Sequence, residues 1–264
     1  MNWTLNNLDL IQELTINHVR LAILPIVLSF VLSIPLGWLA NRNAVTRAIV
    51  ITGGSLLFTI PSLPLFVILP LVIPTGVLDD TNLVVALTIY GVAIMARSAA
   101  DALASVEPTT VDAANAIGYS PVARFLRVEL PLAGPVLLAG IRVVSVSTIA
   151  LVSVGVIIGS ENLGRLFQNG KQRGILEEVV VGILISLLLA LIFDVIIVAL
   201  GRVLMPWTRS PSSRGRGGAA GSPPAGDDGD RPGRETEPGR ETEPGEPRVS
   251  LSGTDGVMPG RGGV

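Results

Sequence analysis

Four long apolar stretches, almost free of charge, constrain this 264-residue chain more than any other feature. One stretch has no charged side chain and the others have one each; they occupy residues 19–40, 48–73, 135–160 and 179–201. Each is at least as long as the roughly 20 residues with which a helix crosses ~30 Å of hydrocarbon at ~1.5 Å per residue. The sequence therefore predicts an all-α membrane protein rather than a soluble enzyme.

The composition argues against several classes of function. Hydrophobic residues make up 49% of the chain, charged residues make up 15%, and the formal net charge is −2. There is no cysteine and only one histidine, His18, so disulfides, thiolate nucleophiles and Cys/His metal sites are not expected. No basic block interrupts the apolar body, so nucleic-acid binding has no electrostatic basis. We expect no metal, no cofactor and no nucleic-acid partner.

A fifth and shorter apolar stretch, residues 82–96, ends at Arg97. At 15 residues it is short for a transmembrane helix and could equally be a buried or re-entrant segment. The chain continues in helix-forming residues to position 104, where Arg97 and Asp101 are four residues apart and can pair on one helix face. We count this stretch as a span with a charged cytoplasmic end, which makes about five transmembrane helices.

Four prolines crowd the second stretch and its exit, at Pro61, Pro64, Pro70 and Pro74. Proline removes a backbone donor and kinks a helix, and in lipid the freed carbonyl groups need partners within the protein. We expect this segment to be broken and to face the bundle, either lining a path or forming a packing kink.

The distribution of charge favours an outside N-terminus and a cytoplasmic C-terminus. With five spans, this orientation leaves more arginines in inner loops than in outer ones, and it brings Trp38 and Trp207 near the inner interface. We predict an extracytoplasmic segment at residues 1–18, a transmembrane domain at residues 19–207 and a cytoplasmic tail at residues 208–264. The tail is rich in Pro, Gly, Ser, Arg and Glu and repeats the sequence GRETEP, so we expect it to be disordered.

The loop between the third and fourth spans predicts two short helices joined by a sharp turn. The alanine-rich residues 112–117 favour a helix, and Gly118 permits the left-handed conformation that ends one. Ser120 is a good N-cap and Pro121 a good first residue for the second helix, which Pro131 would end. One face of that helix carries Val122, Phe125, Leu126 and Glu129. Such a helix pair fits either docking against a partner protein or lying on lipid headgroups.

The same loop resembles the EAA loop of the permease subunits of bacterial ABC importers, whose pattern reads E-A-A-x3-G-x9-I-x-L-P. The spacing is intact, with two conservative departures, and the matching residues are Asp112, Ala113, Ala114, Gly118, Val128, Leu130 and Pro131. Residues 59–63, 138–142 and 158–165 resemble stretches of the glycine betaine/carnitine/choline permeases, in which the last stretch more usually reads IGAGGLG. The resemblance covers roughly residues 15–205.

This resemblance implies a MetI-like bundle in a two-permease core, in the plasma membrane of a bacterium. Cytoplasmic ABC ATPase subunits would drive it, and an extracytoplasmic binding protein would deliver an osmoprotectant such as glycine betaine, choline or carnitine. The sequence has no G-x-x-x-x-G-K-[ST] loop, so ATP would be hydrolysed on another subunit. The ATPase-coupling residues would be Asp112, Ala113, Ala114, Gly118, Val122, Phe125, Leu126, Val128, Leu130 and Pro131.

Two charged side chains fall inside predicted spans, Arg142 in the fourth and Asp194 in the fifth. At ~1.5 Å per residue their depths in the membrane differ by only a few ångströms. Isolated charges in hydrocarbon are costly, so an ion pair is one interpretation. Separate snorkelling or cavity-facing roles, and direct contact with the solute, are the others.

Other functions fit the same apolar body. An importer permease for another small solute, such as an amino acid, is nearest in kind. A self-contained secondary carrier predicts an internal repeat and coupling carboxylates, whereas the spans show no repeat and a single carboxylate, Asp194. An intramembrane enzyme would need catalytic groups inside the bilayer, and this sequence offers no cysteine and no carboxylate pair there.

Overall fold

The computed structural model describes residues 2–76 and 79–208. Within these ranges every regular element is helical, which confirms the predicted all-α class. All but the first residue of the predicted tail, 208–264, lies outside the described residues. The elements in chain order are α1 (Asn2–Asn6), α2 (Leu8–Ala40), α3 (Ala44–Thr59), α4 (Ser62–Val72), α5 (Asp80–Ala104), α6 (Pro108–Ala116), α7 (Pro121–Arg124), the π-helical turn η1 (Phe125–Glu129), α8 (Leu130–Val152), the 3-10 helix η2 (Ser153–Ile158), α9 (Gly164–Arg173), α10 (Leu176–Leu204) and the 3-10 helix η3 (Pro206–Thr208).

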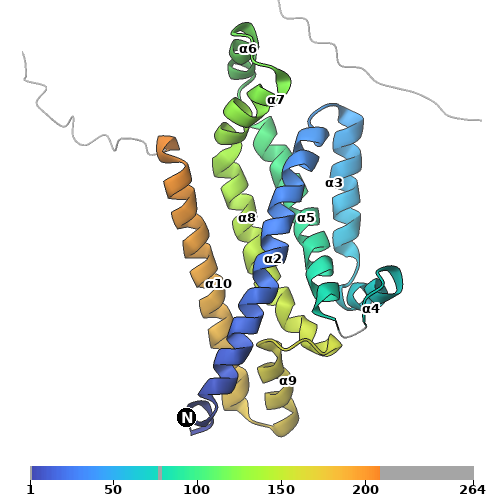
Figure 1. The fold of residues 1–264 in the computed structure, drawn as a ribbon, viewed down its shortest axis with the longest axis vertical. Helices are drawn as coiled ribbons and strands as arrows, with labels where there is room; N and C mark the ends of the chain where they lie inside the picture. Colours follow the sequence, from blue (N-terminus) through green and yellow to red (C-terminus); the bar gives the residue numbers. More distant parts are fainter. Residues whose placement is uncertain (1, 77–78, 209–264) are drawn as a thin grey trace, which may run out of the picture. The chain divides into compact units, whose positions relative to one another are not determined.

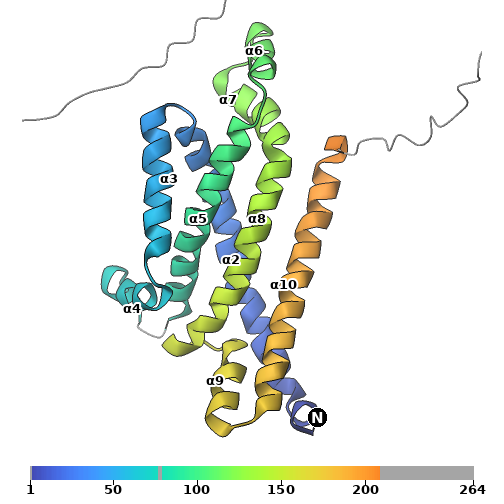
Figure 2. The same cartoon turned by 180° about the vertical axis from the view of Figure 1, so that it is seen from behind.

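Four helices of the described residues are long and apolar enough to cross a membrane. They are α2, α5, the continuous segment from α7 to η2, and α10; the bent pair α3–α4 makes up to five. The short fifth stretch of the sequence is thus a helix of 25 residues, and α2 begins at Leu8 rather than near residue 19. Figures 1 and 2 show α6 and α7 at one end of the bundle, with the N-terminus and α9 at the other.

The proline-rich second stretch is broken, as predicted. Helices α3 and α4 meet at Ile60 and Pro61 with a bend of 103°. In a continuous helix the Ile60 carbonyl would accept from residue 64, which is a proline without an N–H. The Tyr90 hydroxyl of α5 donates to this carbonyl instead, at 2.5 Å. The prediction that the stretch faces the bundle holds for one side of α4, where Phe66 is buried, but α3 has no buried residue.

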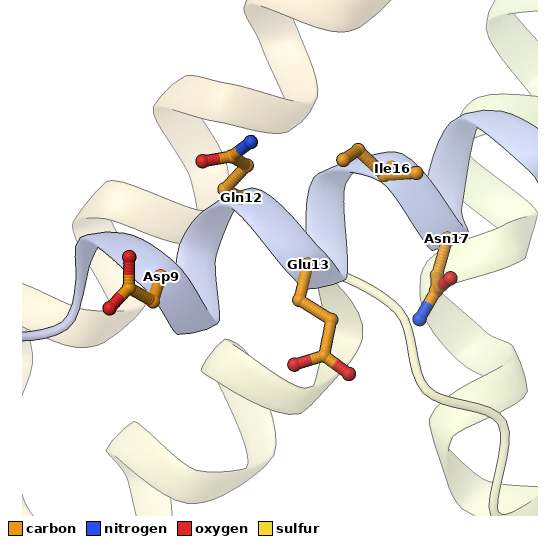
Figure 3. A pocket seen from close by; sticks show the side chains of 5 residues that line it. All are labelled: Asp9, Gln12, Glu13, Ile16 and Asn17. Carbon is orange, nitrogen blue, oxygen red and sulfur yellow. The ribbon is translucent and has the colours of Figure 1, made fainter.

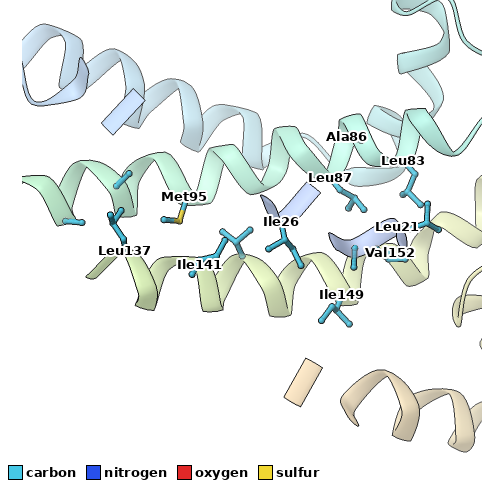
Figure 4. Packing of buried hydrophobic residues seen from close by; sticks show 14 of the residues in the cluster. Leu21, Ile26, Leu83, Ala86, Leu87, Met95, Leu137, Ile141, Ile149 and Val152 are labelled. Atoms are coloured by element: carbon cyan, nitrogen blue, oxygen red, sulfur yellow. The ribbon is translucent and has the colours of Figure 1, made fainter. Parts of the chain in front are cut away.

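The core is formed where α2, α5 and α8 pack together through small residues. A carbon added at Gly91 of α5 would lie 2.6 Å from the Ser29 Cβ of α2, and one at Gly37 would lie 2.7 Å from the Ala99 carbonyl carbon. Such residues let transmembrane helices approach closely. Larger apolar side chains fill the rest, and in Figure 4 Leu87 and Met95 of α5 point toward α8, with Ile26 of α2 between the two helices.

A cluster of polar bonds joins α2, α3 and α5 at the end of the bundle nearer α6 and α7. Arg47 donates to Asp101 at 2.6 Å and to Asn41 at 2.9 Å, and Asn41 donates to the Ala100 carbonyl at 2.8 Å. The expected pairing of Asp101 with Arg97 within its own helix is therefore wrong. Asp101 instead binds an arginine from α3, which packs beside α5.

Candidate functional site: the loop between α5 and α8

Helix α6 ends in a turn that only glycine adopts easily. Gly118 has φ +93°, its N–H donates to the Asn115 carbonyl at 3.0 Å, and the next N–H, from Tyr119, donates to the Ala114 carbonyl at 3.1 Å. These two bonds define the Schellman motif, which satisfies the last carbonyls of a helix. No atom would lie within 4 Å of a Cβ added at Gly118. The constraint at this position is therefore backbone conformation, not crowding.

The second helix begins as the sequence predicts. Ser120 is its N-cap, and its hydroxyl accepts from the Ala123 N–H at 3.4 Å. Pro121 is the first helical residue, where its missing N–H is not needed.

Pro131 does not end this helix, contrary to the prediction. The chain continues from α7 through η1 into α8 without interruption, and the Leu130 N–H donates to the Phe125 carbonyl across the wider π turn. In an unbroken α-helix the ring of Pro131 would clash with the Arg127 carbonyl. The π turn starts a new α-helical segment at Leu130, so Pro131 sits in its first turn, where a missing donor costs little.

The loop exposes an apolar surface that the sequence predicts in part. Val122 and Leu126 are 64% and 54% exposed, whereas Phe125 is half-buried with its ring centroid 6.0 Å from that of Trp38 in α2. Ile117 and Tyr119, exposed in the turn, extend the surface and are absent from the predicted set. Of the other predicted residues, the structure exposes Asp112, Ala113 and Gly118, buries Ala114, and leaves Val128, Leu130 and Pro131 half-buried.

One arginine connects the two halves of the loop. Arg124 of α7 donates from Nε to Glu129 Oε1 at 2.6 Å and from Nη1 to Asn115 Oδ1 at 2.7 Å. Glu129, expected on the same face as Phe125, is thus turned toward Arg124. The side chains of Arg124 and Glu129 are 24% and 13% exposed.

The two intramembrane charges form a bidentate ion pair between α8 and α10. Arg142 Nε lies 2.6 Å from Asp194 Oδ1, and Nη2 lies 2.9 Å from Oδ2. The side chains remain 46% and 25% exposed. An apolar groove of about 530 Å³ lies between α2, α8 and α10 and comes within one helical turn of this ion pair. Its lining includes Ile26, Phe30, Leu138, Ile141, Ile197 and Gly201.

A buried polar cluster at the opposite end joins α2, α5 and α8 to the segment before α9. The His18 ring accepts from the Leu163 N–H at 3.4 Å through Nδ1, so its other nitrogen, Nε2, donates to the Ile149 carbonyl at 3.1 Å. Asn162 caps the start of α9 by accepting from the Gly164 N–H at 2.8 Å, and Ser160 donates to Asp80 at 2.6 Å. Ser160 and Asn162, two of the three residues that depart from IGAGGLG, therefore hold this segment in place. Nothing in the sequence predicts the partners of His18.

A shallow hollow on the first turns of α2 does not form a site. Its lining side chains, Asp9, Gln12, Glu13, Ile16 and Asn17, come from one helix and point in different directions in Figure 3. No group of His, Cys, Asp and Glu in the part of the chain that the structure describes could hold a metal ion.

A helical bundle with four or five candidate spans, and a two-helix loop projecting from one end, defines the class as a multi-pass membrane protein. Residues 33–209 match the family model for the binding-protein-dependent transport system inner membrane component. The chain belongs to this family of ABC importer permeases and is a multi-pass membrane protein.

Relatives and solved structures agree with this assignment. The osmoprotectant import permease protein OsmW of Salmonella typhimurium is 31% identical over 78% of this chain and 97% of its own length. The choline transport system permease protein OpuBB of Bacillus subtilis is 27% identical over 73% and 87%. Among solved structures, the inward-facing MetNI methionine ABC transporter aligns with a TM-score of 0.62 at 22% identity, over 77% of this chain and 99% of that one. The predicted family and MetI-like fold are confirmed.

Proposed function

We propose that this chain is the transmembrane subunit of an ATP-driven importer for osmoprotectants with a methylated ammonium group, such as glycine betaine, choline or carnitine. The alignment over 97% of the osmoprotectant permease OsmW is the observation that carries this proposal. Relatives from Bacillus subtilis named for choline and for glycine betaine/carnitine/choline transport support it.

The loop between α5 and α8 is the contact for the ATPase subunit in this proposal. Its exposed apolar side chains at Ile117, Val122 and Leu126 suit a groove on a partner protein, because burying apolar side chains of this size away from water is favourable in free energy. The loop lies at the opposite end of the bundle from α9, so one face serves the ATPase and the other a binding protein. The chain itself hydrolyses nothing, and a second permease subunit completes the core.

Uptake by the reconstituted complex tests the substrate class. The permease, co-expressed with its neighbouring ATPase and binding-protein genes, should take up labelled glycine betaine, choline or carnitine in an ATP-dependent way. Complexes without the ATPase subunit are the control. Labelled ergothioneine and amino acids form the comparison set, because a relative named for ergothioneine transport is 32% identical over 63% of this chain and 30% of its own length. Uptake of an amino acid alone would contradict the proposal.

Topology is a separate prediction, because the proposed coupling requires the loop in the cytoplasm. Reporter fusions near Asp79 should report an outside location, and fusions near Gly118 and Gly215 should report an inside location. The reason is the excess of arginine in the loops assigned to the inside. An outside signal near Gly118 would place the loop out of reach of an ATPase and contradict the mechanism.

A further inference from the structure

The Arg124–Glu129 ion pair joins residues that an ordinary α-helix keeps apart. The two residues are five positions apart in the chain. In an α-helix each residue turns by ~100°, so side chains five apart are separated by about 140° around the axis. The π turn at Phe125–Glu129 is wider, and its Leu130-to-Phe125 hydrogen bond also spans five residues. The turn therefore brings both side chains to one side, and the ion pair in turn stabilises the π turn over an α-helical one.

The same guanidinium also holds α6. Gly118 separates α6 from α7, so the backbone alone leaves the angle between them free to change. The bond from Arg124 Nη1 to Asn115 Oδ1, 2.7 Å long, closes the turn from the other side. Arg124 thus binds Asn115 at the end of α6 and Glu129 at the start of α8. These two bonds join α6, α7 and η1 into one unit.

That unit is attached to two transmembrane helices. It continues into α8 without a break, and Phe125 from the π turn packs against Trp38 of α2. Arg42 also stacks on Trp38, with its guanidinium carbon 4.1 Å from the ring centroid. A displacement of the loop is therefore passed to α2 and α8 together.

We propose that Arg124 is a positioning residue, which through Glu129 and Asn115 sets the angle at which the loop meets the ATPase subunit. This inference rests on the proposed coupling role of the loop. Arg124 is not part of the exposed apolar surface, so its contribution is to orientation rather than to contact area. Its loss should uncouple the two subunits more than it separates them.

A charge exchange tests the ion pair directly. In proteoliposomes containing the whole complex, Arg124→Glu and Glu129→Arg should each lower the solute transported per ATP hydrolysed by about tenfold. The double variant Arg124→Glu/Glu129→Arg should restore this ratio to within about threefold of the unmodified complex, because the attraction is re-formed. Co-purification of the ATPase subunit should change less than the ratio does. Arg127→Glu, a substitution of an exposed arginine three positions away, is the control for charge and should leave the ratio unchanged.

Two results would overturn the inference. One is normal coupling in Arg124→Glu; the other is a double variant no better coupled than either single variant although it accumulates in the membrane. If the charge reversals prevent accumulation, Arg124→Gln removes the charge with a smaller change, and a normal transport ratio in that variant overturns the inference as well. Failure of the coupling role itself is separate, because it would appear as normal ATPase retention and transport after disruption of the Gly118 turn.

Discussion

Gly118→Asp should abolish ATP-driven uptake while leaving the permease inserted in the membrane. At φ +93° a residue with a Cβ costs about 1 kcal/mol or more, so the Schellman turn at the end of α6 is strained. The change also places a charge beside the exposed apolar side chains of the loop, where contact with a partner would desolvate it. Both effects weaken docking of the ATPase subunit. This subunit should therefore no longer co-purify with the permease, and solute-stimulated ATP hydrolysis should be lost. The binding protein's affinity for its solute should not change.

Gly174→Asp is the matched control for this experiment. Gly174 also has positive φ, at +69°, and open space around a Cβ, but it ends α9 at the opposite end of the bundle. A side chain there meets a left-handed backbone and adds the same charge without touching the loop. We expect its complex to keep the ATPase subunits. A Gly118→Asp complex that retained those subunits and transported normally would show that the loop has no coupling role.

Breaking the Arg142–Asp194 pair should sharply reduce the amount of permease in the membrane. Arg142→Leu leaves Asp194 at bilayer depth without its bidentate partner, and unpaired charges there are costly. The double variant Arg142→Leu/Asp194→Leu removes both charges and should restore the protein level, because apolar replacements of a whole pair are commonly tolerated. Quantitative immunoblots of washed membranes measure the effect.

The double variant also separates stability from transport. If it accumulates and transports normally, the pair only joins α8 to α10. If it accumulates but does not transport, the charges contribute to passage of the solute. A single variant that accumulates as well as the unmodified protein would contradict the expectation that the pair stabilises the bundle.

The sequence predicts those features that depend on neighbours in the chain. The apolar stretches locate the spans, and Gly118, Ser120 and Pro121 define the turn because each acts on its own backbone. The errors concern residues whose partners lie elsewhere or whose spacing is unusual. Asp101 binds Arg47 from another helix, and Glu129 binds Arg124 at a spacing that an α-helix does not bring together. Helical periodicity alone contains neither relationship.

His18 is the strongest case of a contact beyond the reach of sequence. Its ring nitrogens contact residues more than 130 positions away, at Ile149 and Leu163. The sequence shows only a solitary histidine near the edge of an apolar stretch. Its role as a link between α2, α8 and the segment before α9 depends on how three distant elements pack.

Helix α8 is long enough that a change in its tilt would move its two ends in opposite directions. Helix α8 itself, Leu130–Val152, has 23 residues and is roughly 35 Å long at ~1.5 Å each, against ~30 Å of hydrocarbon. A tilt of about 10° around the middle of this helix would move its two ends by roughly 3 Å each, in opposite directions. Arg142 lies close to that middle, so its bond to Asp194 sits near the fulcrum, where displacement is least. A change in the tilt of α8 about this point would therefore move both of its ends while displacing the Arg142–Asp194 contact least.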